Sequence, residues 1–104
     1  MKATVIIAAY KRRDFLMDAL RSVANQVKPA DQVIVVKDFY DKEIDDFISR
    51  NRWVSIINDK VRYGEFVAPA VEEAKGDIIL FLEDDDVFER EKVAIVKKAF
   101  LQRN

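Results

Sequence analysis

The chain has 104 residues, the size of one small domain or of a part of a larger one, which excludes two complete domains. Half of its residues are hydrophobic and 36% are charged, a composition that builds a packed core and argues against disorder. The 18 basic and 19 acidic side chains leave a net charge of −1, without the basic excess that is typical of nucleic-acid-binding domains.

The sequence contains neither cysteine nor histidine. This excludes a disulfide, a thiolate zinc site, a cysteine nucleophile and an imidazole base, so any catalysis falls to carboxylates or to a metal. No apolar run approaches the roughly 18 residues that span a bilayer, and the short apolar run before Lys11 has the wrong order for a signal peptide. We therefore expect a soluble, cytoplasmic protein with no transmembrane segment.

Strand and helix patterns alternate four times along the chain. Aliphatic and β-branched runs predict strands at 3–9, 33–36, 53–57 and 77–82. Apolar residues at three- and four-residue spacing predict helices from 13 to before Pro29, at 41–50, from about 66 to Gly76 with Pro69 in the first turn, and at 89–101. Because no hairpin dipeptide joins the strands, we predict an α/β fold with a parallel sheet covered on both faces.

Four consecutive acids, Glu83 to Asp86, follow the fourth strand, at the edge of the sheet where such folds bind ligands. Clustered carboxylates repel one another, and a divalent cation relieves that repulsion. Side chains alternate along an extended chain, so Glu83 and Asp85 share one side and are predicted to hold Mg²⁺ or Mn²⁺. The alternative is a capping box for the last helix, formed by Asp86 and Glu89.

Polar residues that follow the other strands are candidates for nucleotide binding. Arg12, within the basic stretch Lys11–Arg13, is predicted to meet phosphate oxygens, unless the stretch is simply solvated. Asp38 follows the second strand and is predicted to accept hydrogen bonds from a base or ribose, unless it caps the helix that begins near Asp41. We also count Asp84, from the acidic run, among the nucleotide-binding residues.

Taken together, four segments resemble the first half of a family 2 glycosyltransferase. They are residues 5–12 (VIIAAYKR), 19–26 (ALRSVANQ), 32–38 (QVIVVKD) and 74–88 (AKGDIILFLEDDDVF). The resemblance implies one domain over 1–104, a three-layer, Rossmann-like unit of the GT-A fold with four parallel strands in the order 3-2-1-4. It also implies binding of a nucleotide-diphosphate sugar, with a UDP-sugar as the candidate.

The resemblance further assigns roles to individual residues. It places Ala9 and Tyr10 at the nucleotide, Asp38 at the base, and Glu83 and Asp85 in the DxD motif, where Asp85 holds Mg²⁺ or Mn²⁺ against the diphosphate. The implied reaction is inverting glycosyl transfer to an unknown acceptor. No catalytic residue is assigned, because in the family the catalytic base belongs to an acceptor-binding half that we expect to be absent here.

The chain departs from the family pattern in ways that leave other functions open. Where the family has two acids and a glycine, this chain has Lys37–Phe39. Where the family has an Ala-Arg-Asn stretch, this chain has Phe66–Ala68. The family's arginine is therefore missing at that point, and Arg62 is the candidate to replace it. The alternative function is a non-catalytic, truncated binding or assembly module. A phosphoacceptor domain is disfavoured, because no acidic pair follows the first strand. Without an acceptor half Ile78–Leu82 is uncovered, so we expect a homodimer that covers the fourth strand or the last helix.

Overall fold

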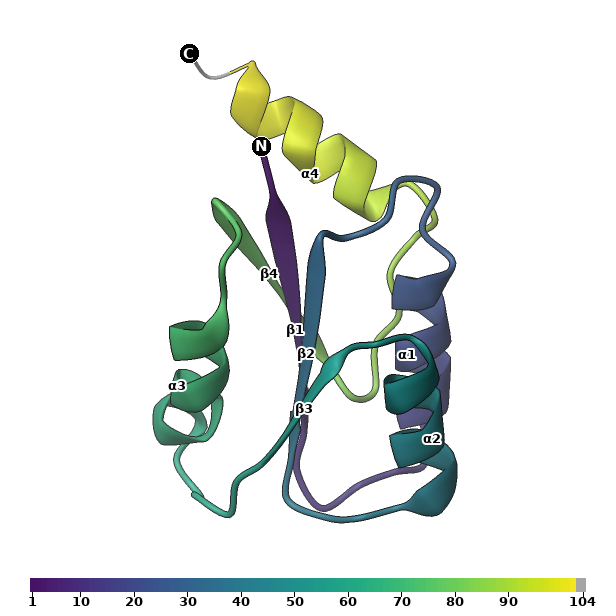
Figure 1. Cartoon of the computed structure of the whole chain (residues 1–104), viewed down its shortest axis with the longest axis vertical. Helices are drawn as coiled ribbons and strands as arrows, with labels where there is room; N and C mark the ends of the chain where they lie inside the picture. The colour runs from purple at the N-terminus through teal and green to yellow at the C-terminus, as the bar shows by residue number, and fades with distance from the viewer. Residues whose placement is uncertain (103–104) are drawn as a thin grey trace.

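The computed structural model describes residues 1–102 as alternating strands and helices (Figure 1). In chain order the elements are β1 (Ala3–Ala9), α1 (Leu16–Ala24), β2 (Gln32–Lys37), α2 (Lys42–Arg50), β3 (Val54–Ile57), α3 (Tyr63–Glu73), β4 (Ile78–Glu83) and α4 (Lys92–Leu101). No helix in this part of the chain is both long enough and apolar enough to span a bilayer.

The four strands form one parallel sheet in the order β3-β2-β1-β4, which confirms the expected topology. The register pairs Ala8 with Glu83, Ala9 with Lys37, and Lys37 with Ile57. Each of these residues lies at or next to the last position of its strand. The carboxyl ends of all four strands therefore meet at one edge of the sheet. The acidic run begins at this edge, because Glu83 is the last residue of β4.

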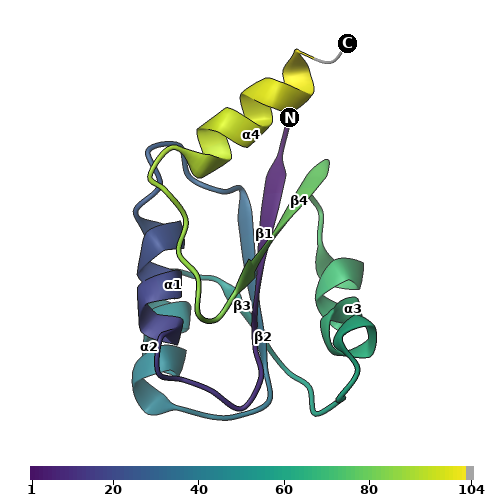
Figure 2. The same cartoon turned by 180° about the vertical axis from the view of Figure 1, so that it is seen from behind.

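Helices cover both faces of the sheet, as expected (Figures 1 and 2). The helices α1 and α2 pack on one face and α3 packs on the other, while α4 lies across the opposite end of the sheet, near the start of β1. Every residue of β1 is buried, because its alternate side chains belong to the two separate hydrophobic cores. The result is the three-layer α/β/α architecture.

The last helix begins later than the sequence pattern predicts. Its N-cap is Glu91, and the Asp86 carboxylate accepts a hydrogen bond from the backbone N–H of Val87 at 3.0 Å, so the capping box is wrong. The buried amide of Gln26 holds the intervening turn, because its Nε2 donates to the Glu89 carbonyl at 2.7 Å. Its Oε1 also accepts the N–H of Val93 at 2.9 Å. A tertiary contact from the segment that follows α1 therefore sets the start of α4.

Proline lies in the interior of α3, which corrects the expectation that Pro69 belongs to the first turn. Pro69 has no N–H to donate to the carbonyl of Glu65, which would leave that acceptor unpaired. The side chain of Asn58, just after β3, supplies the missing donor. Its Nδ2 lies 3.1 Å from the Glu65 oxygen and 2.9 Å from the Phe66 oxygen. This contact also fixes α3 against the carboxyl edge of the sheet.

We expect Asn58→Ala to lower the free energy of unfolding by about 1–2 kcal/mol, because the Glu65 carbonyl loses the donor that replaces the missing N–H of Pro69. Pro69→Ala restores an N–H that reaches Glu65, so the same Asn58 substitution should cost less in that background. Urea unfolding of the four proteins of this double-mutant cycle measures the difference. Equal costs of Asn58→Ala in both backgrounds would show that Asn58 does not compensate for the proline.

Candidate functional site

A hollow of about 270 Å³ opens at the carboxyl edge of the sheet, between the ends of β1 and β4 and the start of α3. It brings together four of the predicted site residues: Tyr10, Arg12, Glu83 and Asp84. Ala9 does not reach it, because it is fully buried and packs in the core under α1. The complete lining is Ala8, Tyr10, Arg12, Tyr63, Phe66, Glu83 and Asp84.

Aromatic rings form one side of this hollow. Tyr10 and Phe66 meet edge to face, with their ring centroids 5.7 Å apart, and Tyr63 adds a third ring from the first turn of α3. The Lys11 ammonium lies 5.3 Å from the centroid of the Tyr10 ring. Rings arranged in this way offer flat apolar surfaces on which a planar group can pack.

A paired arginine and aspartate form the charged side. Arg12 donates from Nη2 to Oδ1 of Asp84 at 2.9 Å and from Nε to Oδ2 at 3.2 Å, and Asp84 is only 5% exposed. The hydrogen bond to Asp84 and the charge of that carboxylate raise the pKa of Arg12 above its ordinary value. Asp84 thereby holds the guanidinium in one orientation, while the Arg12 side chain stays half exposed and its Nη1 has no partner among the described residues.

The remaining acids differ in how they are engaged. Burial and the neighbouring Glu83 carboxylate raise the pKa of Tyr63 to about 12, so the phenol stays protonated beside that carboxylate. The Asp85 side chain is half exposed, lies outside the hollow and approaches Arg12 Nη2 only to 3.6 Å. The hollow is thus lined by Glu83 and Asp84, whereas Asp85 and Asp86 lie outside it.

The acidic residues do not form a ready-made metal cage. Within residues 1–102, no three His, Cys, Asp or Glu side chains are grouped so that they could hold a metal. Mg²⁺ in nucleotide sites takes one or two carboxylates and completes its shell with phosphate oxygens and water. The exposed carboxylates Glu83 and Asp85 fit that mode, in which the metal arrives with the nucleotide.

Asp38 is engaged by the chain itself and does not line the hollow. Its Oδ1 accepts the backbone N–H of Lys11 at 2.6 Å, and Lys11 has a φ of 59°, a left-handed conformation that is uncommon outside glycine. Asp38 thus stabilises the turn that carries Tyr10 and Arg12. The proposed helix-cap role is wrong, because Asp41 caps α2 by accepting the N–H of Ile44.

Lys37, which replaces an acid of the family pattern, does not line the hollow. Its side chain is fully buried, and its Nζ lies 2.7 Å from Oδ1 of Asp45 and 2.6 Å from the carbonyl of Phe39. The rings of Phe39 and Tyr40 lie 5.3 and 5.5 Å from the same ammonium. The positive charge is therefore neutralised inside the molecule, where it clamps the loop that contains Asp38 onto α2.

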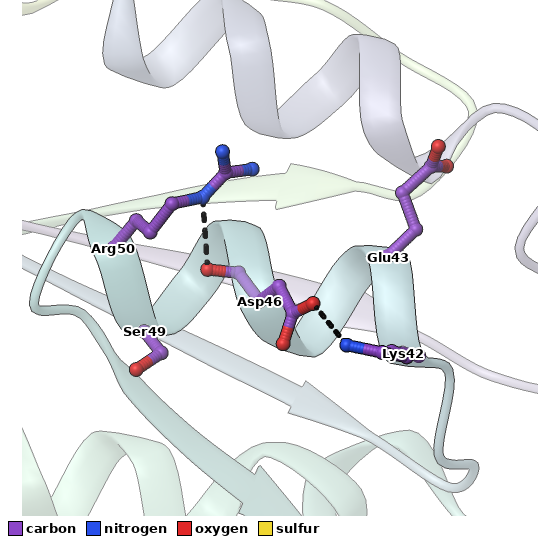
Figure 3. A pocket seen from close by; sticks show the side chains of 5 residues that line it. All are labelled: Lys42, Glu43, Asp46, Ser49 and Arg50. Atoms are coloured by element: carbon purple, nitrogen blue, oxygen red, sulfur yellow. Dashed lines mark hydrogen bonds and ion pairs between the residues drawn. The ribbon is translucent and has the colours of Figure 1, made fainter.

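A second hollow, of about 620 Å³, lies on the outer surface of α2 (Figure 3). Its charged side chains already have partners: Lys42 Nζ lies 2.8 Å from Asp46 Oδ2, Arg50 Nε donates to the Asp46 carbonyl at 3.4 Å, and Glu43 accepts from Arg13 Nη2 at 3.0 Å. Figure 3 shows these side chains spread along the helix rather than converging on one point. This surface is consistent with a solvated helix face.

Sequence reasoning missed three lining residues. Ala8 and Phe66 were expected only as parts of a strand and a helix, and Tyr63 was not selected. Arg62, the candidate replacement arginine, points into solvent with 87% of its side chain exposed and lies 3.9 Å from Glu65. The usable signal for Tyr63 was its position, because an aromatic residue at the start of a helix that follows a strand end lies beside the ligand edge.

Comparison with known proteins shows where this fold recurs. Residues 4–104 match the profile described as Glycosyl transferase family 2. The crystal structure of S. aureus TarS aligns with a TM-score of 0.76 at 25% identity, covering 99% of this chain and 20% of that chain. TarS 1-349 in complex with UDP aligns with a TM-score of 0.71 at 25% identity, covering 99% of this chain and 32% of that one.

A third solved structure supports the fold alone. The mannosyltransferase PcManGT from Pyrobaculum calidifontis, in complex with GDP-Man and Mn²⁺, aligns with a TM-score of 0.75 at 18% identity, covering 93% of this chain and 31% of that one. No curated protein matches significantly. The likenesses confirm the GT-A arrangement of strands and helices, and the chain spans about a fifth to a third of the length of these structures.

We expect Asp45→Asn to lower the free energy of unfolding by about 3 kcal/mol, because it leaves the buried Lys37 ammonium without its carboxylate. The matched control is Asp46→Asn on the same helix, which removes an exposed i,i+4 pair and should cost at most about 0.5 kcal/mol. Urea unfolding at neutral pH compares the two variants. A similar small cost for both would contradict the clamp inferred for Lys37.

Proposed function

Because the chain belongs to glycosyl transferase family 2, we propose that it binds a nucleotide-diphosphate sugar, and specifically a UDP-sugar, together with Mg²⁺ or Mn²⁺ for glycosyl transfer. The proposal treats residues 1–104 as one nucleotide-sugar-binding unit. The observation that carries it is the hollow at the carboxyl edge, in which aromatic rings, a guanidinium and the start of the acidic run meet. The UDP complex of TarS supports uridine as the base.

The nucleotide-binding roles follow from the contacts within the site. Tyr10 packs against the base or ribose, and Arg12, oriented by Asp84, directs its remaining N–H groups at the diphosphate. Asp38 accepts a hydrogen bond from the base or ribose, and its bond to the N–H of Lys11 fixes the turn that follows β1. Ala9, which is fully buried, acts only by leading the backbone into that turn.

Glu83 and Asp85 are the residues that would hold the divalent metal. Their carboxylates are exposed at the end of β4, beside Arg12 and the hollow. A bound divalent cation would offset the negative charge that develops on the departing diphosphate. The Mn²⁺ in the PcManGT complex supports a divalent ion in this fold.

The reaction is displacement at the anomeric carbon of the sugar with inversion, in which a hydroxyl of an unknown acceptor replaces the nucleoside diphosphate. No residue of the hollow is assigned as the base that deprotonates this hydroxyl. The alternative is a non-catalytic binding or assembly module, which binds the donor but turns none over. Incubation with UDP-sugars and release of UDP distinguishes the two functions. The cytoplasmic location stays a prediction.

We expect Mn²⁺ and UDP together to raise the Tm more than either alone, because the carboxylates and the diphosphate share one cation. At about 100 times the dissociation constant, the stabilisation is about 2.7 kcal/mol. Asp85→Asn should abolish the cooperative part of the rise, measured by thermal melting with each component alone and with both.

Asp86→Asn is the matched control, since the Asp86 carboxylate bonds to its own loop and should leave the cooperative rise intact. GDP replaces UDP in a parallel series and should raise the Tm less. A wild-type Tm that stays unchanged at millimolar Mn²⁺ and UDP would show that the site does not bind this nucleotide.

We also propose that the chain forms a homodimer through β4. In the described residues β4 pairs only with β1, so its outer edge has unpaired backbone groups. Ile79 and Phe81 are 36% and 48% exposed on the sheet face that α3 leaves uncovered, and a groove of about 370 Å³ runs between β4 and α4. Exposed edge strands of this composition pair readily with another chain.

Sedimentation equilibrium at micromolar concentrations should therefore detect a dimer. Phe81→Lys places a charge on the proposed interface and should shift the protein to monomer, whereas Val61→Lys, at an exposed position away from β4, should not. A wild-type protein that remains monomeric at high micromolar concentration would refute the dimer.

A further inference from the structure

Tyr63 occupies a distinctive position in the site. It lies on α3, opposite the strand ends that carry the other polar lining residues, and half of its surface is exposed at the hollow. Its ring is the third aromatic surface there, beside Tyr10 and Phe66. Phe66 is buried and Tyr10 is only partly exposed, so Tyr63 is the ring of the three with the most surface open to a ligand.

The hydroxyl of Tyr63 connects this aromatic wall to the acidic run. Tyr63 and Glu83, the first acid of the predicted metal pair, both line the hollow, and the Glu83 carboxylate raises the pKa of the Tyr63 phenol. A carboxylate at the end of a strand is otherwise free to rotate, and a donor on one oxygen restricts that rotation and leaves the other oxygen for a further partner. The one side chain thus lies beside both the space for a planar group and the carboxylate that would face a metal.

We propose that Tyr63 binds the nucleotide of the sugar donor and positions Glu83 in this site. Its ring forms the α3 wall on which the nucleobase packs, and its hydroxyl orients Glu83 toward the metal and diphosphate. In this arrangement Tyr63, and not Arg62, provides the contact of α3 with the nucleotide, because the Arg62 side chain extends into solvent. The inference rests on the proposed binding of UDP in the hollow, and it assigns to this chain a residue outside the predicted set.

Two substitutions distinguish the role of the Tyr63 ring from the role of its hydroxyl. Tyr63→Ala removes the ring and the hydroxyl, so the Kd for UDP measured without metal should rise about tenfold. Tyr63→Phe keeps the ring, so the metal-free Kd should stay within about twofold of wild type. The hydroxyl is lost in Tyr63→Phe, so the factor by which Mn²⁺ tightens UDP binding should fall about three- to tenfold.

Isothermal titration of the full chain with UDP, and with inorganic pyrophosphate plus Mn²⁺, measures these quantities. Pyrophosphate has no base, so Tyr63→Ala and Tyr63→Phe should weaken its Mn²⁺-dependent binding equally. Val61→Ala is the control, because Val61 is 79% exposed and does not line the hollow. Thermal melting of each variant confirms that it is folded before titration.

Each outcome addresses one of the two proposals. If the wild-type protein binds neither UDP nor pyrophosphate, the proposed function fails, and the role of Tyr63 fails with it. If the wild-type protein binds UDP and Tyr63→Ala binds it equally well, only the stacking role is overturned. If Tyr63→Phe retains the full effect of Mn²⁺, the hydroxyl does not position Glu83.

Discussion

The structure depends on the complete burial of β1. All seven residues of this strand are shielded from solvent, and its side chains are shared between two cores on opposite faces of the sheet. A strand that is apolar on both faces must lie inside the sheet and under helices on each side. The neighbours β2 and β4 therefore end beside β1, and the residues that follow the three strands converge at one edge.

Charge at that edge is balanced largely within the chain. Asp84 pairs with Arg12, Asp38 accepts the N–H of Lys11, and Glu83 lies beside the protonated phenol of Tyr63. Each of these contacts holds a different side of the site, so they stabilise its shape and reduce the repulsion between neighbouring carboxylates. Asp85 approaches Arg12 only to 3.6 Å, and its side chain stays half exposed.

Unusual residues of this chain are compensated by specific partners. The lysine at position 37 would place a charge in the core, and Asp45 with the Phe39 carbonyl neutralises it. The proline within α3 would leave a carbonyl unpaired, and Asn58 supplies the donor. Both compensations act on segments that position the site, the loop that contains Asp38 and the helix that carries Tyr63. Lys37 and Pro69 therefore act outside the lining of the hollow.

The sequence by itself determined the order of the elements, the burial of the two central strands and the edge at which the site lies, because hydrophobic periodicity and chain order are local properties. It did not anticipate the exposure of β3 and of alternate residues of β4, which lie at the two edges of the sheet. The resemblance to the family added the strand order. The tertiary structure decided which of the candidate side chains meet. It turned Asp84 inward onto Arg12, committed Asp38 to Lys11, moved the start of α4 through Gln26, and brought Tyr63 to Glu83. These contacts join residues from different elements, up to 72 positions apart for Arg12 and Asp84, so their partners follow from packing and not from any local pattern.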